Sequence, residues 1–159
     1  MGMTIKYPYL PAGRKYEYVP ESNEFMLAAK EYALAHSLDG AHPTGSVLVK
    51  NGVIIGRGAN GNDYHNRHGC ERKRRGIPTG ERYELCEGCH PKNHSEPRAI
   101  ADASSNGFDP RGADLYLWGH WWCCKPCWDA MIAAGVQAVF LMIGSEALFN
   151  RTGPQNGKG

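Results

Sequence analysis

Four segments of the chain show the spacing of apolar residues that is typical of an α-helix. Residues 22–37 are the first, with apolar positions on one stripe at Phe25, Ala28, Ala29, Tyr32 and Ala33. The same period returns in residues 95–105 and 124–134, and residues 145–149 are a shorter candidate. Gly135 directly follows the third segment, where glycine commonly ends a helix. We therefore predict three helices and a short fourth one.

Strand patterns lie between these predicted helices. In residues 46–61, SVLVKNGVIIGRGANG, two runs rich in β-branched residues flank Asn51-Gly52, the strongest short signal for a hairpin. Residues 113–118, ADLYLW, have a short strand pattern, and residues 136–143, VQAVFLMI, are typical of a buried strand. Strands that alternate with helices predict the α/β class, with parallel strand pairs and helices packed against the faces of the sheet.

The remaining segments carry no regular pattern. Residues 1–20 contain three prolines and are interpreted as an N-terminal arm, and residues 151–159 as a flexible tail. Residues 21–150 then form one domain, in agreement with a length of 159 residues. Residues 61–93 are a polar, Cys/His-rich insertion in this domain. So long a segment without a helix or strand pattern is unusual in a compact domain, so we expect an additional interaction to hold it in place.

Composition and charge narrow the classes of protein. Hydrophobic residues make up 42% and charged residues 21%, as is ordinary for a globular protein, and a net charge of +2 gives no global argument for nucleic-acid binding. No stretch of about 18 apolar residues is present, so we expect no membrane span. The N-terminal residues lack the apolar stretch of a signal peptide, which predicts a cytoplasmic location. Metal binding by the six cysteines is then favoured over disulfides.

Two short motifs supply a set of metal ligands. His94 stands two residues before Glu96 at the start of one predicted helix, and Cys124 and Cys127 stand in C-x-x-C spacing at the start of another. Zinc binds imidazole nitrogen and thiolate sulfur, and a catalytic zinc has three protein ligands and an open fourth position. Glu96 need not bind the metal at this offset, and we expect it to shuttle a proton. A closed structural zinc site and unrelated buried thiols are the alternatives.

These motifs resemble the H-x-E…P-C-x-x-C signature of zinc-dependent nucleobase deaminases. NHSEPRAIADA is similar to a helix of the cytidine/deoxycytidylate deaminase superfamily, LYLWGHWWCCKPCWDAMIAAGV to its strand, cysteine motif and helix, and GSVLVKNGVIIGRGANG to its first hairpin. The resemblance covers about residues 25–143. It implies a three-layer α-β-α fold, a mixed sheet with a hairpin followed by parallel strands, and a contact between Asn60 and the substrate. Cys123 stands where the family usually has proline, so it is an alternative ligand to Cys124.

A second metal site is predicted within the insertion. Cys70, Cys86 and Cys89 have a spacing close to that of structural zinc sites, and His68 is the favoured fourth ligand. Deoxycytidylate deaminases, which the chain resembles, often carry extra Cys and His in this segment, and some bind a second zinc there. Such a metal would order a long polar segment, because its binding free energy becomes folding free energy. The alternative is three free thiols in a loop.

Only a few residues give information about the identity of the substrate. The zinc chemistry fits attack at C4 of cytosine or C6 of adenine. His42 is a candidate phosphate contact or a turn residue, and Trp121 or Trp122 is a candidate for stacking on a base. We expect a cytosine nucleotide as the substrate, with dCMP converted to dUMP. The alternatives are a deaminase of single-stranded DNA or RNA, which the basic insertion would serve, and a non-catalytic zinc-binding module. Family members are often oligomers, so self-association is expected as well.

Overall fold

The computed structural model describes residues 9–39, 42–61, 74–76 and 93–149. Its centre is a five-stranded sheet with the strand order β1-β5-β4-β2-β3. The strands are β1 (Tyr16–Val19), β2 (Gly45–Lys50), β3 (Val53–Ala59), β4 (Asp114–Trp118) and β5 (Ala138–Met142). β2 pairs antiparallel with both β3 and β4, whereas β5 pairs parallel with both β4 and β1. The predicted mixed sheet, in which a hairpin is followed by parallel strands, is confirmed.

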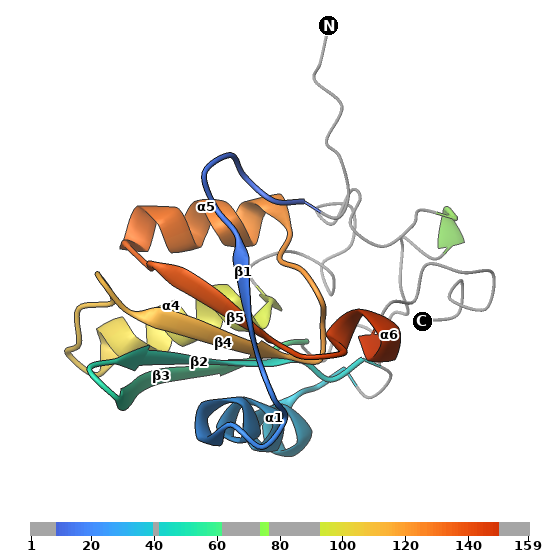
Figure 1. The fold of residues 1–159 in the computed structure, drawn as a ribbon, viewed down its shortest axis with the longest axis horizontal. Helices are drawn as coiled ribbons and strands as arrows, with labels where there is room; N and C mark the ends of the chain where they lie inside the picture. The colour runs from blue at the N-terminus through green and yellow to red at the C-terminus, as the bar shows by residue number, and fades with distance from the viewer. Residues whose placement is uncertain (1–8, 40–41, 62–73, 77–92, 150–159) are drawn as a thin grey trace, which may run out of the picture.

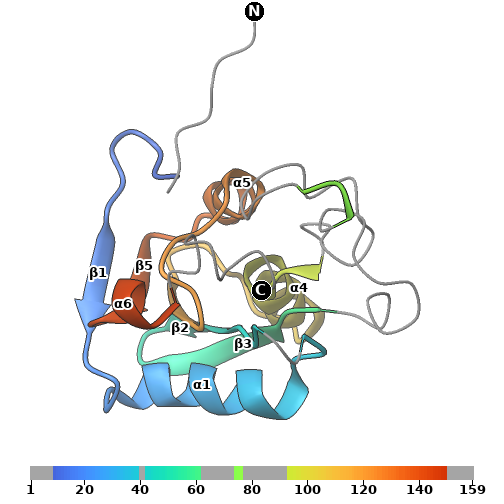
Figure 2. The ribbon, with the colours of Figure 1, turned by 90° about the vertical axis from the view of Figure 1, so that its right-hand side faces the viewer.

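Helices cover both faces of this sheet (Figure 1, Figure 2). α1 (Glu24–His36) lies on one face, and α4 (Ser95–Ser105) and α5 (Lys125–Ala134) lie on the other, while the short α6 (Ser145–Phe149) follows β5. Alternate residues of one strand enter opposite cores. Leu115 and Leu117 of β4 pack in the cluster that contains residues of α5, whereas Tyr116 packs in the cluster that contains residues of α1. The predicted three-layer α-β-α arrangement is therefore confirmed.

Local sequence signals set the ends of these elements. The side chain of Asn23 accepts hydrogen bonds from two backbone N–H groups of α1, at 2.9 and 3.0 Å, and so caps the start of the helix. Gly135 ends α5 with a φ of 84°, a left-handed conformation that glycine adopts without strain. Asn51 and Gly52 turn the hairpin with φ values of 54° and 77°, as the Asn-Gly pair predicts.

The predicted N-terminal arm is wrong for residues 16–19, because these residues form strand β1. The strand pairs in parallel with β5 and is an edge of the sheet. It has four residues and ends beside Pro20, so its pattern is too short for an assignment from sequence. Arg14 adds a second link to the same region, since its Nη1 donates to the carbonyl oxygen of Val136 at 3.1 Å.

Two glycines of β3 let α4 lie directly against the sheet. A Cβ atom at Gly56 would come within 2.3 Å of the carbonyl oxygen of Ala99, and a Cβ atom at Gly58 within 2.3 Å of the carbonyl oxygen of Ser95. Neither position has room for a side chain unless the helix backbone moves. The helix that begins at the H-x-E motif is therefore held close to the hairpin.

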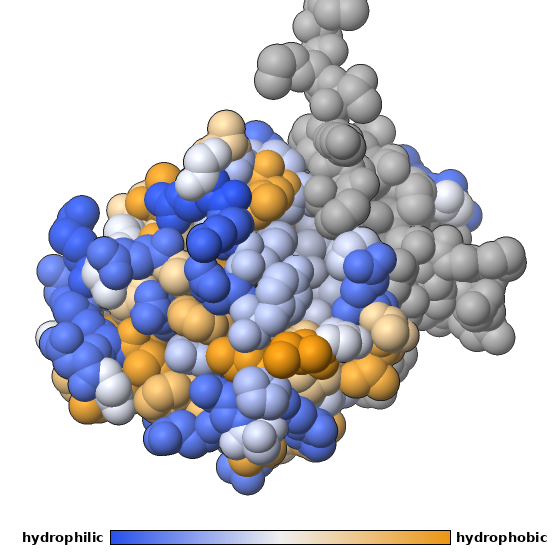
Figure 3. Space-filling view, viewed as in Figure 1, coloured by the Kyte–Doolittle hydropathy of each residue, from blue (hydrophilic) through white to orange (hydrophobic). Residues whose placement is uncertain are grey.

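The face that carries β1 and α6 mixes hydrophilic with hydrophobic residues (Figure 3). Tyr18 of β1, Leu148 of α6 and Ile143 between β5 and α6 are exposed large apolar residues. Within the described residues, the outer edge of β1 pairs with no other strand. None of the helices in the described parts of the chain combines the length and the apolar content that a bilayer crossing needs.

Candidate metal centre

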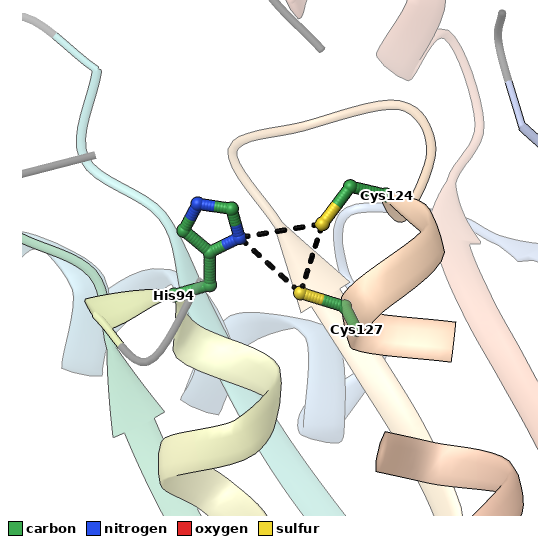
Figure 4. Close-up of side chains that lie close together, drawn as sticks. All are labelled: His94, Cys124 and Cys127. Carbon is green, nitrogen blue, oxygen red and sulfur yellow. Dashed lines mark hydrogen bonds between the residues drawn. The ribbon is translucent and has the colours of Figure 1, made fainter. Parts of the chain in front are cut away.

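Two helix N-termini bring three metal-binding side chains together (Figure 4). His94 is the residue before the first turn of α4, Cys124 has the same position before α5, and Cys127 lies in the first turn of α5. Pro126 suits that turn, because the N–H that proline lacks would have no partner inside the helix. The positive end of the α5 dipole favours thiolate over thiol at both cysteines. The local structure thus presents one imidazole and two sulfurs to a common point.

The three ligand atoms form a small triangle. Nδ1 of His94 lies 3.2 Å from Sγ of Cys127 and 3.4 Å from Sγ of Cys124, and the two sulfurs are 3.2 Å apart. A tetrahedral zinc with ordinary bond lengths places such atoms about 3.5–3.8 Å apart, so the side chains fit the ion after a small expansion. Among the described residues, these three make up the whole group that could hold a metal ion. Three protein ligands are the number that a catalytic zinc takes.

The charge states of the two cysteines suit a cation. A hydrogen bond from the Cys127 thiol, supported by His94, lowers the pKa of Cys124 to about 6 against the opposing effect of burial. The same hydrogen bond, together with burial, raises the pKa of Cys127, so the pair holds one proton near neutral pH. Zinc displaces that proton when it binds, because the metal takes thiolate ligands. The donor set and its charge therefore fit Zn²⁺, and the predicted cofactor is confirmed.

Glu96 lies near the ligand triangle without belonging to it. It is the second residue of α4, is only 5% exposed, and accepts a hydrogen bond from Oγ of Ser95 at 3.2 Å. Its negative charge also helps to raise the pKa of the thiols of Cys123 and Cys127. A buried carboxylate in this position can take up and return a proton.

The ligand set contains Cys124 and not Cys123, which the sequence left as an alternative. Cys123 is fully buried and lies outside the triangle, and its thiol forms a hydrogen bond with Glu96. Burial above all, and then the charge of Glu96, raise the pKa of this thiol well above its ordinary value. Cys124 is therefore the cysteine that the structure places with His94 and Cys127, and Cys123 lies outside this group.

A tyrosine that sequence reasoning missed holds the cysteine loop in place. Oη of Tyr16 accepts the backbone N–H of Cys123 at 2.8 Å and the indole N–H of Trp128 at 3.1 Å, and it donates to the carbonyl oxygen of Tyr9 at 3.1 Å. Burial raises the pKa of the Tyr16 hydroxyl, which keeps it a donor. Strand β1 thus reaches the metal centre through one side chain. The only signal in the sequence is an aromatic residue in the short alternating run YEYV.

The predicted substrate residues Asn60 and His42 meet in one loop. The side-chain amide of Asn60 donates to the carbonyl oxygen of His42 at 2.9 Å. Its Oδ1 accepts the backbone N–H of Thr44 at 2.9 Å and the hydroxyl of Ser37 at 2.5 Å. Asn60 therefore fixes the segment that enters β2, and His42 contributes its backbone to that turn.

Arg98 links this loop to the metal centre, a role that sequence reasoning did not assign. Its Nη1 donates to the carbonyl oxygens of Ala59 and Gly61 at 2.9 and 2.6 Å, and its Nη2 donates to Oδ1 of Asn93 at 3.0 Å. The N–H of Gly61 donates to the carbonyl oxygen of Asn93 at 2.9 Å. Because Asn93 directly precedes His94, the end of the hairpin and the imidazole ligand are fixed relative to each other.

The two tryptophans predicted to stack on a base differ in burial. Trp122 is only 5% exposed and packs in the core beside α5, which argues against base stacking by its ring. Trp121 is half-buried and packs against the same core. Nδ1 of His120 accepts the backbone N–H groups of both tryptophans, at 2.9 and 3.2 Å, and braces the turn before the cysteines. Of the two, Trp121 remains the candidate.

The predicted second metal site lies outside the described residues. His68, Cys70, Cys86 and Cys89 all fall within residues 62–73 and 77–92. Between these two segments the structure describes residues 74–76, in which two arginines are exposed. The second site therefore stays a prediction.

A zinc site of one imidazole and two thiolates with a buried glutamate nearby is typical of hydrolytic deaminases. The three-layer fold agrees with that class. The chain belongs to the family described as the cytidine and deoxycytidylate deaminase zinc-binding region, whose sequence model matches residues 20–143. It is thus a zinc-dependent hydrolytic deaminase. No curated protein matches the chain at a significant level.

Solved structures of other deaminases are similar to this chain. The crystal structure of dCMP deaminase from the cyanophage S-TIM5 in complex with dCMP and dUMP is 22% identical, has a TM-score of 0.51, and the match covers 81% of this chain and 89% of that chain. Guanine deaminase from Bacillus subtilis is 23% identical, with a TM-score of 0.48 and coverage of 78% and 66%. The diaminohydroxyphosphoribosylaminopyrimidine deaminase/5-amino-6-(5-phosphoribosylamino)uracil reductase from Thermotoga maritima is 26% identical, with a TM-score of 0.46, and the match covers 74% of this chain but 28% of that chain. The cyanophage structure shows the shared fold, and the named substrates differ among the three proteins.

Proposed function

We propose that the chain removes the exocyclic amino group of a cytosine nucleotide and converts dCMP to dUMP with release of ammonia. The observation that carries this proposal is the buried Glu96 near the triangle of His94, Cys124 and Cys127. Support for cytosine comes from the matching family, which is described by cytidine and deoxycytidylate. The cyanophage protein of the same fold is a dCMP deaminase, which agrees with this choice.

The side chains of the protein contribute proton transfer to the reaction. Zinc, when bound, supplies the Lewis acid that makes water a nucleophile near neutral pH. Glu96 takes a proton from the attacking water and gives it to N3 of the base, and then assists departure of the amino group as ammonia. One water is consumed and one ammonia is released, so cytosine becomes uracil. The burial of Glu96 limits competition from bulk water for that proton.

Asn60 and Trp121 are the proposed substrate-binding residues. The amide of Asn60 has a second N–H besides the one donated to His42, and this group would donate to the sugar or the base. Arg98 and Asn93 tie Asn60 to the ligand His94, so a substrate held by Asn60 is placed relative to the metal. The half-buried ring of Trp121 would stack on the base, and His42 stays a proposed phosphate contact.

A deamination screen by mass spectrometry on zinc-loaded protein tests the proposal. It compares cytidine, deoxycytidine, their phosphates, adenine and guanine compounds and single-stranded oligonucleotides. The expected result is conversion of dCMP in preference to the other compounds. Replacing Glu96 by glutamine should lower kcat by about 10²–10⁴-fold with zinc content unchanged. The matched control is Asp129→Asn, an exposed carboxylate of α5 that should keep wild-type turnover.

Other outcomes of this screen would replace the proposal. Deamination of oligonucleotides alone, with affinity that falls steeply with salt, would assign a polynucleotide substrate. Bound zinc without ammonia release from any compound would assign a non-catalytic module. Wild-type turnover in the Glu96→Gln variant would remove Glu96 from the reaction. A cytoplasmic location and self-association belong to the proposal and are tested by fractionation and by light scattering.

A further inference from the structure

Two buried serine hydroxyls form a chain of hydrogen bonds that ends at Glu96. Ser46 is on β2 and Ser95 is the first residue of α4, and both are 0% exposed. Their Oγ atoms are 2.7 Å apart, and Oγ of Ser95 is 3.2 Å from Oε1 of Glu96. A hydroxyl in a dry core is costly unless it is paired, and here each one is paired with the next.

The direction of these hydrogen bonds follows from the carboxylate. An ionised carboxylate only accepts, so the hydroxyl of Ser95 donates to Oε1 of Glu96. The oxygen of Ser95 is then left to accept, and the hydroxyl of Ser46 donates to it. Both hydroxyl protons therefore point toward Glu96, and each bond polarises the next one.

The surroundings show that hydroxyls are not needed here for packing. α4 meets β3 through the smallest residues, with Gly56 and Gly58 on the strand against Ala99 and Ala103 on the helix. Gly58 is the residue that pairs with Ser46 in the hairpin, so the close approach of α4 is what brings Ser95 onto Ser46. Alanine would fill either serine position in such an interface, and the two hydroxyls are the exception.

We propose that Ser95, backed by Ser46, is a positioning residue that fixes one oxygen of Glu96 and leaves Oε2 as the oxygen that carries the shuttled proton. A carboxylate held in this way needs no reorientation when the proton arrives, and such preorganisation acts on kcat more than on KM. This inference rests on the proposed function of Glu96.

The experiment compares Ser95→Ala, Ser46→Ala, the double variant and Ser145→Ala, whose buried hydroxyl on α6 is the matched control. Ser95→Ala should lower kcat about tenfold with KM within about twofold, since hydrogen bonds to charged groups are among the stronger ones. Ser46→Ala should lower kcat about two- to threefold, because Ser95 still donates to Glu96. The double variant should match Ser95→Ala in kcat and exceed it in Tm, since it leaves no buried hydroxyl unpaired. Ser145→Ala should keep wild-type kcat.

A second readout does not depend on turnover. The infrared carboxylate band of Glu96 is obtained from the difference between wild type and Glu96→Gln, and it responds to hydrogen bonds at the carboxylate. The band should shift in Ser95→Ala, shift less in Ser46→Ala, and stay in place in Ser145→Ala. If no substrate of the wild type is found, the proposed function fails. The infrared band alone then shows whether Ser95 forms its hydrogen bond with Glu96. A fall in kcat without a band shift, or an unmoved band with unchanged kcat, would overturn the inference.

Discussion

Replacing Tyr16 by phenylalanine is expected to loosen the zinc site while all three ligands remain in the chain. The variant loses one oxygen atom and keeps the ring, so the tilted contact with Trp128, with centroids 5.7 Å apart, is retained. The hydrogen bonds lost are those to the N–H of Cys123, the indole N–H of Trp128 and the carbonyl oxygen of Tyr9. The change therefore tests one hydroxyl that joins β1 to the cysteine loop.

The size of the effect follows from burial. Cys123 is 0% exposed and Trp128 is 1% exposed, so two buried donors lose their acceptor. Each such group costs about 1–3 kcal/mol, and the free energy of unfolding should fall by roughly 2–6 kcal/mol. For a chain of this length, about 2–4 °C of Tm corresponds to each kcal/mol, which gives a drop on the order of 4–24 °C.

Circular dichroism of the zinc-loaded protein measures the Tm, and competition with a chelator measures the zinc Kd. Tyr18→Phe is the matched control, because it removes a hydroxyl from the same strand at a residue that is 57% exposed. This control should change stability by less than about 0.5 kcal/mol. If Tyr16→Phe and Tyr18→Phe have the same Tm and the same zinc Kd, the Tyr16 hydroxyl does not anchor the loop.

Three other perturbations test the ligand set and its placement. Cys124→Ala should lose stoichiometric zinc in metal analysis and Cys123→Ala should keep it, and equal zinc content in both would contradict the assignment. Zinc binding near pH 7 should release about one proton, because Cys124 with a pKa of about 6 is mostly ionised while Cys127 is not, and the release should rise as the pH falls below 6. Calorimetry in buffers of different ionisation enthalpy counts these protons, and a release that does not change with pH would refute the charge assignment. Gly58→Ala should destabilise the fold by about 1–3 kcal/mol in urea denaturation, since a Cβ at this position meets helix backbone, and an unchanged midpoint would show that α4 can shift freely.

Regular elements were predictable where their pattern is local. The helices and the hairpin follow from apolar period and turn residues that lie within a dozen positions of each other, and their bounds differ from the prediction by two residues or fewer. β1 was missed because four residues give no period, and because its partner strand lies at the other end of the domain. What fixes such a strand is backbone pairing, which the side chains of the segment do not encode.

The metal ligands were predictable because their motifs are also local. The H-x-E motif that begins at His94 and the C-x-x-C motif each span no more than about one helical turn. The residues that hold the ligands in place were not predictable. Tyr16 and Arg98 act on backbone groups brought near by the fold, and no motif marks such partners. The C-x-x-C spacing to Cys127 already favoured Cys124 over Cys123, and the structure groups Cys124 with His94 and Cys127.

The pairing of β1 with β5 has a consequence for the order of events during synthesis on the ribosome. Contacts in this region join residues as distant as Arg14 and Val136, which are 122 positions apart. All three zinc ligands are translated before β5, yet β1 and its tyrosine can dock only after β5 has emerged. A nascent chain would therefore possess its ligands before β1 can dock, and full metal retention should be acquired only after β5 has emerged from the ribosome.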